Sequence, residues 1–429
     1  MKFQTILKKN NVERVLLIDP AFPIANKSRN HKDLLPVGLL KISSYLKSKG
    51  IETKLVRLND DEDFEDEFKR FNPNLVMITS VFTYWFNEVK EAVELSKEYL
   101  PDVKVMVGGI LASLYPSNKL RKEIPQINYV HQGVLECAEH LPPDYSILEN
   151  GGEDIDFQII HSTRGCKRKC PFCGVNKIEK NFDDVGSIEK ELIGKKNLVF
   201  YDNNLLANPR IEDLLKELIR LKEEKKITKC ESQSGFDGRL LHENEDLAKL
   251  LKKANFKDPK IAWDGPFKAY KRREDEISIL ERAGYNRKEI AVFMLYNHDL
   301  SYEELEKKRA KCFEWGVQVS DCRYRPLNRL SDGYNPHKRK QAPDEYYIHK
   351  GWSDEEVRQF RRNVRRHNIC IRHNMEYHSR QAEIKKISKE ESMIIRDMTA
   401  EQAMATGIID DAWDPAKPYI IKKSKKSDE

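Results

Sequence analysis

The chain has 429 residues, of which 34% are charged, with a formal net charge of +6 and a mean hydropathy of −0.70. This length predicts two or three domains with buried cores, and no apolar run approaches the roughly 20 residues of a membrane-spanning helix. Eight cysteines are too few for a disulfide framework, and the first residues show no secretory signal. We therefore expect a cytoplasmic protein with no membrane partner.

The first 150 residues alternate between apolar runs and amphipathic helical patterns. Strands are predicted over residues 15–18, 53–56, 75–79, 103–107 and 127–130, and one intervening helix over 87–100. This order predicts an α/β fold with a doubly wound, Rossmann-like parallel sheet that binds ligands at the carboxyl ends of its strands. Candidate ligand contacts at that edge are Thr79, Ser80, Gly108 and Gly109, because glycine lets a ligand approach the backbone. No G-x-G-x-x-G motif follows the first strand, which disfavours a dinucleotide.

Residues 151–330 contain six apolar segments, each followed by a helical pattern. The segments cover residues 157–161, 197–201, 229–233, 260–263, 290–295 and 317–322, and the clearest helices are predicted over 211–224 and 302–315. Six such units predict a partial (β/α)6 barrel. Chemistry in barrels of this kind lies on the loops at the carboxyl ends of the strands.

Three cysteines follow the first strand of this barrel. Cys166, Cys170 and Cys173 form a C-x3-C-x2-C pattern, with Phe172 directly before the last of them. Three thiolates on one loop can hold three corners of a cubane iron–sulfur cluster and leave the fourth iron open. The alternatives are a zinc knot or three unrelated thiols, but structural zinc sites usually have four ligands in paired spacings.

This motif resembles the signature of radical S-adenosylmethionine (radical SAM) enzymes. The resemblance implies that the three cysteines hold a [4Fe–4S] cluster and that the open iron binds S-adenosylmethionine. It implies reductive cleavage of S-adenosylmethionine to a 5′-deoxyadenosyl radical, fed by a flavodoxin-like or ferredoxin-like electron donor.

The resemblance also indicates where S-adenosylmethionine is held. Family members commonly carry Gly-Gly-Glu after the second strand to receive the methionine amino group, whereas this chain has Asp202, Asn203 and Asn204. Carboxylate and amide oxygens can accept the same hydrogen bonds. Further contacts for the cofactor or substrate are predicted at later strand ends, namely Ser232, Gln233, Asp237, Asp264, Tyr296, Asn297, Arg323 and Arg325. Each of these alone could equally be a structural ion-pair partner.

The first 150 residues resemble the cobalamin-binding domain that precedes the barrel in one large radical SAM subfamily. The matching pieces are residues 35–40, 77–80 and 107–116. The D-x-H-x-x-G motif is absent, so cobalt ligation by that histidine is not expected. A Rossmann-like domain that has lost its ligand is the alternative. Methylthiotransferases of the superfamily use three further N-terminal cysteines, and only Cys137 precedes the signature here, which disfavours that activity.

Residues 331–429 are predicted to form a basic, mostly helical cap and tail. Ser353 and Glu356 form a capping box that opens a helix with Val357, Phe360 and Val364 on one face. The other face carries Arg358, Arg361, Arg362, Arg365 and Arg366, and residues 323–380 hold 14 Lys/Arg against 7 Asp/Glu. This face could bind nucleic acid, or it could be an ordinary solvated face. Cys370 could donate hydrogen to a product radical, although an ordinary buried thiol is the simpler interpretation.

These observations predict a radical SAM enzyme with domains 1–150, 151–330 and 331–429, which methylates an unactivated carbon with the help of cobalamin. Two alternatives stay open. One is a radical rearrangement or cyclisation without cobalamin, and the other is a nucleic-acid-binding iron–sulfur protein. The sequence does not identify the substrate.

Overall fold

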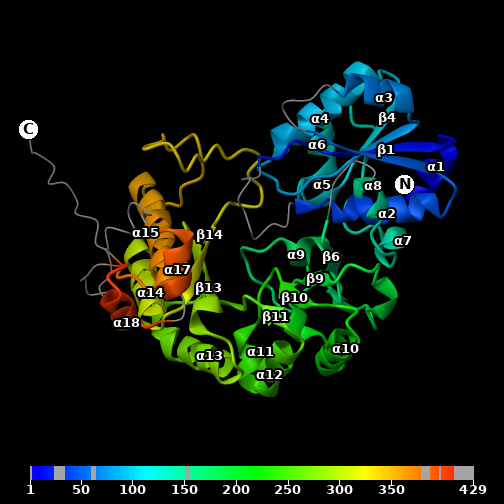
Figure 1. Cartoon of the computed structure of the whole chain (residues 1–429). Helices are drawn as coiled ribbons and strands as arrows, with labels where there is room; N and C mark the ends of the chain where they lie inside the picture. Colours follow the sequence, from blue (N-terminus) through cyan, green and yellow to red (C-terminus); the bar gives the residue numbers. More distant parts are fainter. Residues whose placement is uncertain are drawn as a thin grey trace, which may run out of the picture.

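The computed structural model describes residues 2–23, 34–58, 64–149, 155–377, 387–395 and 398–409. In this part of the chain a parallel sheet flanked by helices is followed by an arc of further parallel strands and then by C-terminal helices (Figure 1). The α/β fold class predicted from the sequence is confirmed. None of the described helices is both long enough and apolar enough to span a bilayer.

The N-terminal sheet has five parallel strands in the order β2-β1-β3-β4-β5. They are β1 (Arg14–Asp19), β2 (Glu52–Arg57), β3 (Leu75–Ile78), β4 (Lys104–Val107) and β5 (Tyr129–Val130). The chain changes direction across the sheet at β1 and β3, which is the topological switch point where open α/β sheets bind ligands. The predicted doubly wound sheet is present.

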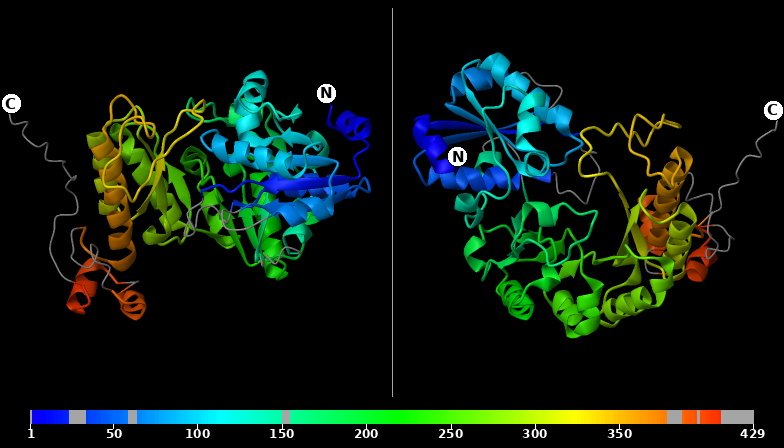
Figure 2. Two further views of the ribbon diagram at one scale, coloured as in Figure 1. Left: turned by 90° about the horizontal axis from the view of Figure 1, so that it is seen from above. Right: turned by 180° about the vertical axis from the view of Figure 1, so that it is seen from behind.

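Helices cover both faces of this sheet (Figure 2). Leu17 and Met77 point to the face that packs against α1 (Phe3–Lys9), α2 (Val37–Lys47), α7 (Glu136–Glu139) and α8 (Ser146–Glu149). Leu16 and Val76 point to the face that packs against α3 (Glu65–Phe71), α4 (Phe86–Tyr99), α5 (Gly109–Leu114) and α6 (Ser117–Glu123). The alternation of strand side chains therefore divides the core into two layers.

All six barrel strands form at their predicted places. They are β6 (Phe157–Ile160), β9 (Asn197–Phe200), β10 (Lys229–Ser232), β12 (Lys260–Ala262), β13 (Ala291–Tyr296) and β14 (Gln318–Arg323). They form two sheets, however, in the orders β11-β10-β9-β6 and β12-β13-β14, linked by an isolated bridge between Phe236 and Ile261. The short strand β11 (Phe256–Lys257) takes the edge of β10 that β12 would need, so the predicted barrel is an arc of two sheets.

Helices cover the outside of this arc. They are α10 (Ile211–Glu223), α11 (Gly238–Glu243), α12 (Asp246–Lys253), α13 (Tyr270–Arg282) and α14 (Tyr302–Glu314). Leu214, Leu218 and Leu221 of α10 are buried in the core, as their helical spacing predicts. The cysteines lie between β7 (Thr163–Arg164) and α9 (Val175–Ile178), and β7 pairs with β8 (Asp183–Asp184) in an antiparallel hairpin.

The C-terminal helices are α15 (Asp354–His373), α17 (Lys389–Ile395) and α18 (Ala400–Ala405). The predicted capping box between Ser353 and Glu356 opens α15, and Val357 and Phe360 are buried as expected. The predicted basic face of this helix needs one correction. The Arg358 side chain is only 3% exposed, so it is not part of that surface. Arg361, Arg362 and Arg365 are exposed.

The segment that follows β14 runs back to the N-terminal domain (Figure 1). Ser331 forms an antiparallel bridge with Trp85. The guanidinium of Arg325 lies 4.2 Å from the ring centroid of Tyr84 and 3.3 Å from the carboxylate of Asp332. The end of the arc is therefore tied to the carboxyl edge of the N-terminal sheet.

Candidate functional site

The three signature cysteines share one half-buried loop at the carboxyl end of β6. The backbone N–H of Cys173 donates to the carbonyl of Cys170 at 3.0 Å, which closes a turn between these two thiols. The backbone N–H of Arg168 donates to Sγ of Cys166 at 3.3 Å. Burial raises the pKa of Cys166 and Cys170, so their thiolates need a positive partner.

Asp202 anchors the start of the cysteine loop. Its carboxylate accepts hydrogen bonds from the backbone N–H and the hydroxyl of both Ser162 and Thr163, at 2.6 to 3.1 Å. The side chain is fully buried, and burial raises its pKa although these donors act in the opposite direction. These contacts use the carboxylate within the protein, while its predicted role toward the methionine amino group stays a prediction.

A second contact joins the cysteine loop to the third strand. Arg168 donates to the carboxylate of Asp237 at 2.7 and 2.8 Å, and the Asn204 amide donates to it at 3.3 Å. Burial alone would raise the pKa of Asp237, but hydrogen bonds from Arg239 and Arg168 hold it below its usual range. Oδ1 of Asn204 is buried without a hydrogen-bond partner in the described residues, and it is an acceptor available to a ligand.

Glu179 is a site residue that the sequence analysis missed. Its carboxylate accepts hydrogen bonds from the Gly165 backbone and from Asn203 at 2.5 and 3.1 Å, and pairs with Arg164 at 2.8 Å. It therefore holds both ends of the cysteine loop against the second strand. Its position six residues after Cys173 in the chain gives no signal of this role, because the contacts form only in three dimensions.

Three of the remaining predicted contacts are engaged within the protein. Ser232 donates to the Gly235 carbonyl at 3.2 Å, and Gln233 donates to Glu231 at 3.0 Å. Arg323 is bound to the buried carboxylate of Asp332. Arg323 thus lies in a structural ion pair, and its predicted contact with S-adenosylmethionine stays a prediction.

The four predicted residues of the N-terminal edge come together. The Ser80 hydroxyl donates to the Gly108 carbonyl at 2.5 Å, and Thr79 lies half-buried one residue before it. Gly109 has a φ of +87°, and a Cβ there would lie 2.3 Å from the Ser80 carbonyl oxygen, so only glycine fits. A Cβ at Gly108 would meet nothing closer than 3.9 Å, which leaves its backbone open to a ligand.

His131 adds a further sign of a ligand at this edge. It follows β5, and its backbone N–H donates to the Val107 carbonyl at 2.9 Å, beside Gly108. Its Nε2 is buried without a hydrogen-bond partner among the described residues. An orphaned buried nitrogen next to an open glycine is compatible with a large polar cofactor at this edge.

The N-terminal edge and the cysteine loop touch directly. A Cβ on Gly174, the residue after Cys173, would lie 3.1 Å from Leu114 of α5 and 3.7 Å from Leu327. The ring of Phe172 packs edge-on against His298 at the end of β13, with centroids 6.0 Å apart. The carboxyl edge of the N-terminal sheet and the cysteine loop, which are the two predicted cofactor sites, therefore meet at Gly174.

The cysteine loop fits a cluster by its type of donors. It offers three thiols on one turn and a backbone donor to one of them. Within the described ranges, no three His, Cys, Asp or Glu side chains converge on a single metal ion. A cubane spreads its irons over a wider volume than one ion, and coordination deprotonates a thiol outright, so the raised thiol pKa is no obstacle.

Comparisons with known proteins agree with this arrangement. Residues 29–139 match the B12 binding domain family. Ribosomal protein uS12 methylthiotransferase RimO of Fervidobacterium nodosum is 26% identical over 148 residues, which cover 28% of this chain and 34% of that protein. The chain resembles the radical SAM enzymes that carry a cobalamin-binding domain. The match spans about a third of the length of RimO, so the activity of that relative is not carried over.

One solved structure is also similar. It is described as the apo, SeMet-labelled cobalamin-dependent S-adenosylmethionine radical enzyme OxsB, with a TM-score of 0.47 and 13% sequence identity. The similarity covers 73% of this chain and 53% of that one.

Proposed function

We propose that this chain is a radical SAM enzyme that methylates an unactivated carbon with the help of cobalamin. The observation that carries the proposal is the packing of Gly174 against Leu114, which sets the three-cysteine loop beside the open edge of a sheet matched to the B12 binding domain. When bound, the [4Fe–4S] cluster and S-adenosylmethionine supply a 5′-deoxyadenosyl radical, and methylcobalamin supplies the methyl group.

The chain's own residues bind and orient these groups. Cys166, Cys170 and Cys173 would hold the cluster, and Asp202 and Glu179 fix the backbone that presents them. Oδ1 of Asn204 is an acceptor that the methionine ammonium could use. Gly108 and His131 would border the cobalamin.

The first test measures cleavage of S-adenosylmethionine by anaerobically reconstituted protein with dithionite. We expect deoxyadenosine and several irons per chain from the wild type, and neither from Cys170→Ala. Cys137→Ala is the matched control, because Cys137 lies outside the loop on α7. Equal yields from wild type and Cys170→Ala, or zinc in place of iron by elemental analysis, would remove the enzymatic proposal.

The second test addresses cobalamin. Protein from cells grown with hydroxocobalamin should show the visible spectrum of bound corrinoid. Gly108→Leu should abolish that spectrum, because its φ is −133° and the side chain would extend into open space at the sheet edge. Gly351→Leu, at an exposed position before α15 and outside the N-terminal sheet, is the control. A wild-type protein that never binds cobalamin would favour the rearrangement or cyclisation alternative.

A further inference from the structure

One face of the sheet formed by β12, β13 and β14 is left uncovered by the described residues. Along β13, Val292 and Met294 are fully buried in the core beneath the outer helices. Phe293 and Leu295 point to the opposite, inner face of the arc, because side chains alternate along a strand. Both are partly exposed, and neither belongs to a hydrophobic core of the described structure.

The register of the sheet extends this inner face over all three strands. Leu295 pairs with Cys322 of β14, and Phe293 pairs with Ala262 of β12. Asp264 lies two residues after Ala262, and the residue between them is buried in the core, so Asp264 continues the row of Leu295 and Cys322. Cys322 and Asp264 are both exposed. The inner face therefore carries two apolar groups, an accessible thiol and a carboxylate.

The corresponding face of the neighbouring sheet is covered. Ile159 of β6 and Val199 of β9 pack into one core with Leu17 and Met77 of the N-terminal sheet. The N-terminal domain thus lies over the first sheet of the arc, and the described residues leave the second sheet open to a ligand.

The carboxyl end of the open face adjoins the cysteine loop. His298 lies two residues beyond the end of β13, and its ring packs against that of Phe172, directly before Cys173, with centroids 6.0 Å apart. Burial, followed by the negative charge of Asp264, raises the pKa of the Cys170 thiol. A ligand on the inner face would therefore end beside the loop at which the radical is proposed to form.

Asp264 gives this face a negative charge. Its carboxylate has no hydrogen bond or ion pair with a described residue. Burial raises its pKa, and the charge of Lys308 opposes this effect. Lys308 is itself fully buried, and its ammonium donates to the carbonyls of Trp263 and Gly265 at 2.5 and 3.1 Å. An exposed carboxylate without a partner, at the end of an apolar face, is complementary to a protonated amine.

We propose that the inner face of β12, β13 and β14 binds the substrate, and that this substrate is an amine with a hydrocarbon body. Phe293 and Leu295 contact the hydrocarbon, and Asp264 accepts hydrogen bonds from the ammonium group. The inference rests on the proposed function, because a radical formed at the cysteine loop needs a substrate within reach. A second copy of the chain is the rival occupant, but two apolar side chains are too few for a stable dimer interface, which buries about 800 Å² per partner.

The test uses Cys322 as a reporter on this face. Reconstituted protein with bound S-adenosylmethionine is alkylated with iodoacetamide, and the rate at Cys322 is followed by mass spectrometry with octylamine, octanol or octanoate present. Octylamine should protect Cys322 at a roughly tenfold lower concentration than octanol, because a charge-assisted hydrogen bond adds to the same apolar burial. Octanoate should protect least, since Asp264 repels it.

Two variants divide the face into its charged and apolar parts. Asp264→Asn should remove the preference for octylamine over octanol, whereas Leu295→Ala should weaken protection by both compounds. Asp275→Asn, at an exposed position on α13, is the matched control. Equal protection by octylamine and octanol, or a preference that survives in Asp264→Asn, would overturn the inference. Loss of S-adenosylmethionine binding in Asp264→Asn would also overturn it, and so would protection of Cys322 that appears only as the protein concentration rises.

This experiment is independent of the proposed function, because protection of Cys322 does not require cleavage of S-adenosylmethionine. A wild type that forms deoxyadenosine with dithionite but shows no preference for the amine would remove this inference alone. A wild type that shows the preference but forms no deoxyadenosine would instead remove the proposed function.

Discussion

Asp202 positions the cysteine loop rather than presenting a free carboxylate. Its four accepted hydrogen bonds all come from Ser162 and Thr163, the residues that lead from β6 into the loop. A hydrogen bond to a charged group contributes about 1.5–3 kcal/mol, so this one side chain fixes the entry to the thiols. Its acceptor oxygens thus bind the local backbone and hydroxyl groups, and the ligand contact suggested by the sequence stays a prediction.

Substituting Asp202 should weaken the hydrogen bonds that hold the start of the cysteine loop in place. We expect Asp202→Asn to lower the free energy of unfolding by about 2–3 kcal/mol, because an amide offers one acceptor oxygen to four donors. Iron uptake during reconstitution should fall as well. Urea unfolding and iron analysis measure the two effects, with the exposed Asp183→Asn as control. Unchanged iron uptake in Asp202→Asn would contradict the positioning role.

His367 makes stability depend on pH. It is fully buried on α15, one ring nitrogen contacts the Val317 carbonyl at 2.7 Å, and burial lowers its pKa to about 3. In the unfolded chain the imidazole gains a proton below about pH 6.5, whereas in the native protein it stays neutral. The free energy of unfolding should therefore fall as the pH falls, by about 2 kcal/mol from this group between pH 6.5 and 5.

A glutamine at this position isolates the effect. His367→Gln can still donate to the Val317 carbonyl but does not titrate. The difference in unfolding free energy between wild type and His367→Gln should therefore change by about 2 kcal/mol between pH 6.5 and 5. Parallel stability curves for the two proteins over this range would contradict the assignment.

Cys370, three residues further along α15, is a buried thiol that donates to the Glu376 carbonyl and has no exposed face for hydrogen transfer.

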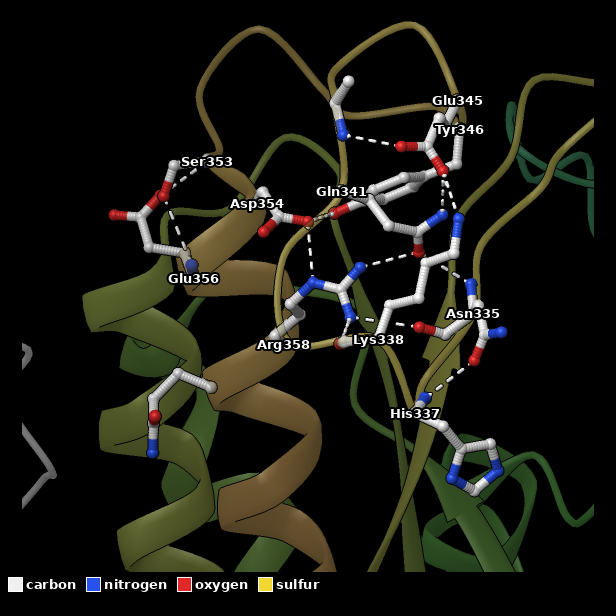
Figure 3. A network of polar contacts seen from close by, with 12 residues as sticks. Asn335, His337, Lys338, Gln341, Glu345, Tyr346, Ser353, Asp354, Glu356 and Arg358 are labelled. Carbon is white, nitrogen blue, oxygen red and sulfur yellow. Dashed lines mark hydrogen bonds and ion pairs between the residues drawn. The ribbon is translucent and has the colours of Figure 1, made fainter.

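At the scale of elements, α15 holds an irregular segment through one arginine. Arg358 donates to the carboxylate of Asp354, the side chain of Gln341 and the carbonyls of Asn335 and Lys338 (Figure 3). Gln341 in turn donates to the Gly333 carbonyl at 2.8 Å. The residues between β14 and α15 form no regular helix or strand in the described structure. The side chains of Arg358 and Gln341 therefore supply hydrogen bonds to the backbone carbonyls of this segment.

Removing the guanidinium should release this segment. We expect Arg358→Met to cost about 3–5 kcal/mol of unfolding free energy, the usual loss when one partner of a buried pair is removed. Arg362→Met is the control, because Arg362 is exposed on the same helix and, among the described residues, donates a hydrogen bond only to Gln359. Limited proteolysis should cut Arg358→Met within residues 333–346. Protection of that segment equal to wild type would contradict this account.

At the scale of the whole molecule, a chain of ion pairs joins the N-terminal domain to the cysteine loop. Lys41 of α2 pairs with Glu139 of α7 at 3.0 Å, Glu139 pairs with Arg164 of β7 at 3.1 Å, and Arg164 pairs with Glu179 at 2.8 Å. All four side chains are at most 22% exposed, so solvent and salt screen these pairs less than surface ones. These ion pairs therefore fix the position of the cysteine loop relative to the predicted cobalamin-binding domain.

The carboxylate of Glu139 takes part in two of these ion pairs, so its loss should have the largest effect. We expect Glu139→Gln to lower the free energy of unfolding by about 1–3 kcal/mol, because Lys41 and Arg164 lose a shared charged acceptor. Amide hydrogen exchange in residues 163–179 should increase at the same time, since Arg164 holds that loop through Glu179. Glu136→Gln is the control on the same helix at an exposed position. Faster exchange in both variants, or in neither, would contradict the coupling.

The sequence by itself determined the elements and the chemistry of the donors. Strand and helix positions follow from the spacing of apolar residues, which is local, and each of the six arc strands lies where that spacing predicts it. The cysteine spacing and the glycine pair after β4 are likewise local, because neighbours in the chain are neighbours in space.

Only the tertiary structure decided how these pieces meet. The split of the arc depends on β11 taking the edge of β10, and the burial of Arg358 depends on a loop 17 to 23 residues away in the chain. The packing of Gly174 on Leu114 and the ion pairs through Glu139 join residues up to 98 positions apart. Long-range contacts leave no periodic trace in a sequence, because their partners are chosen by packing and charge after the local elements have formed.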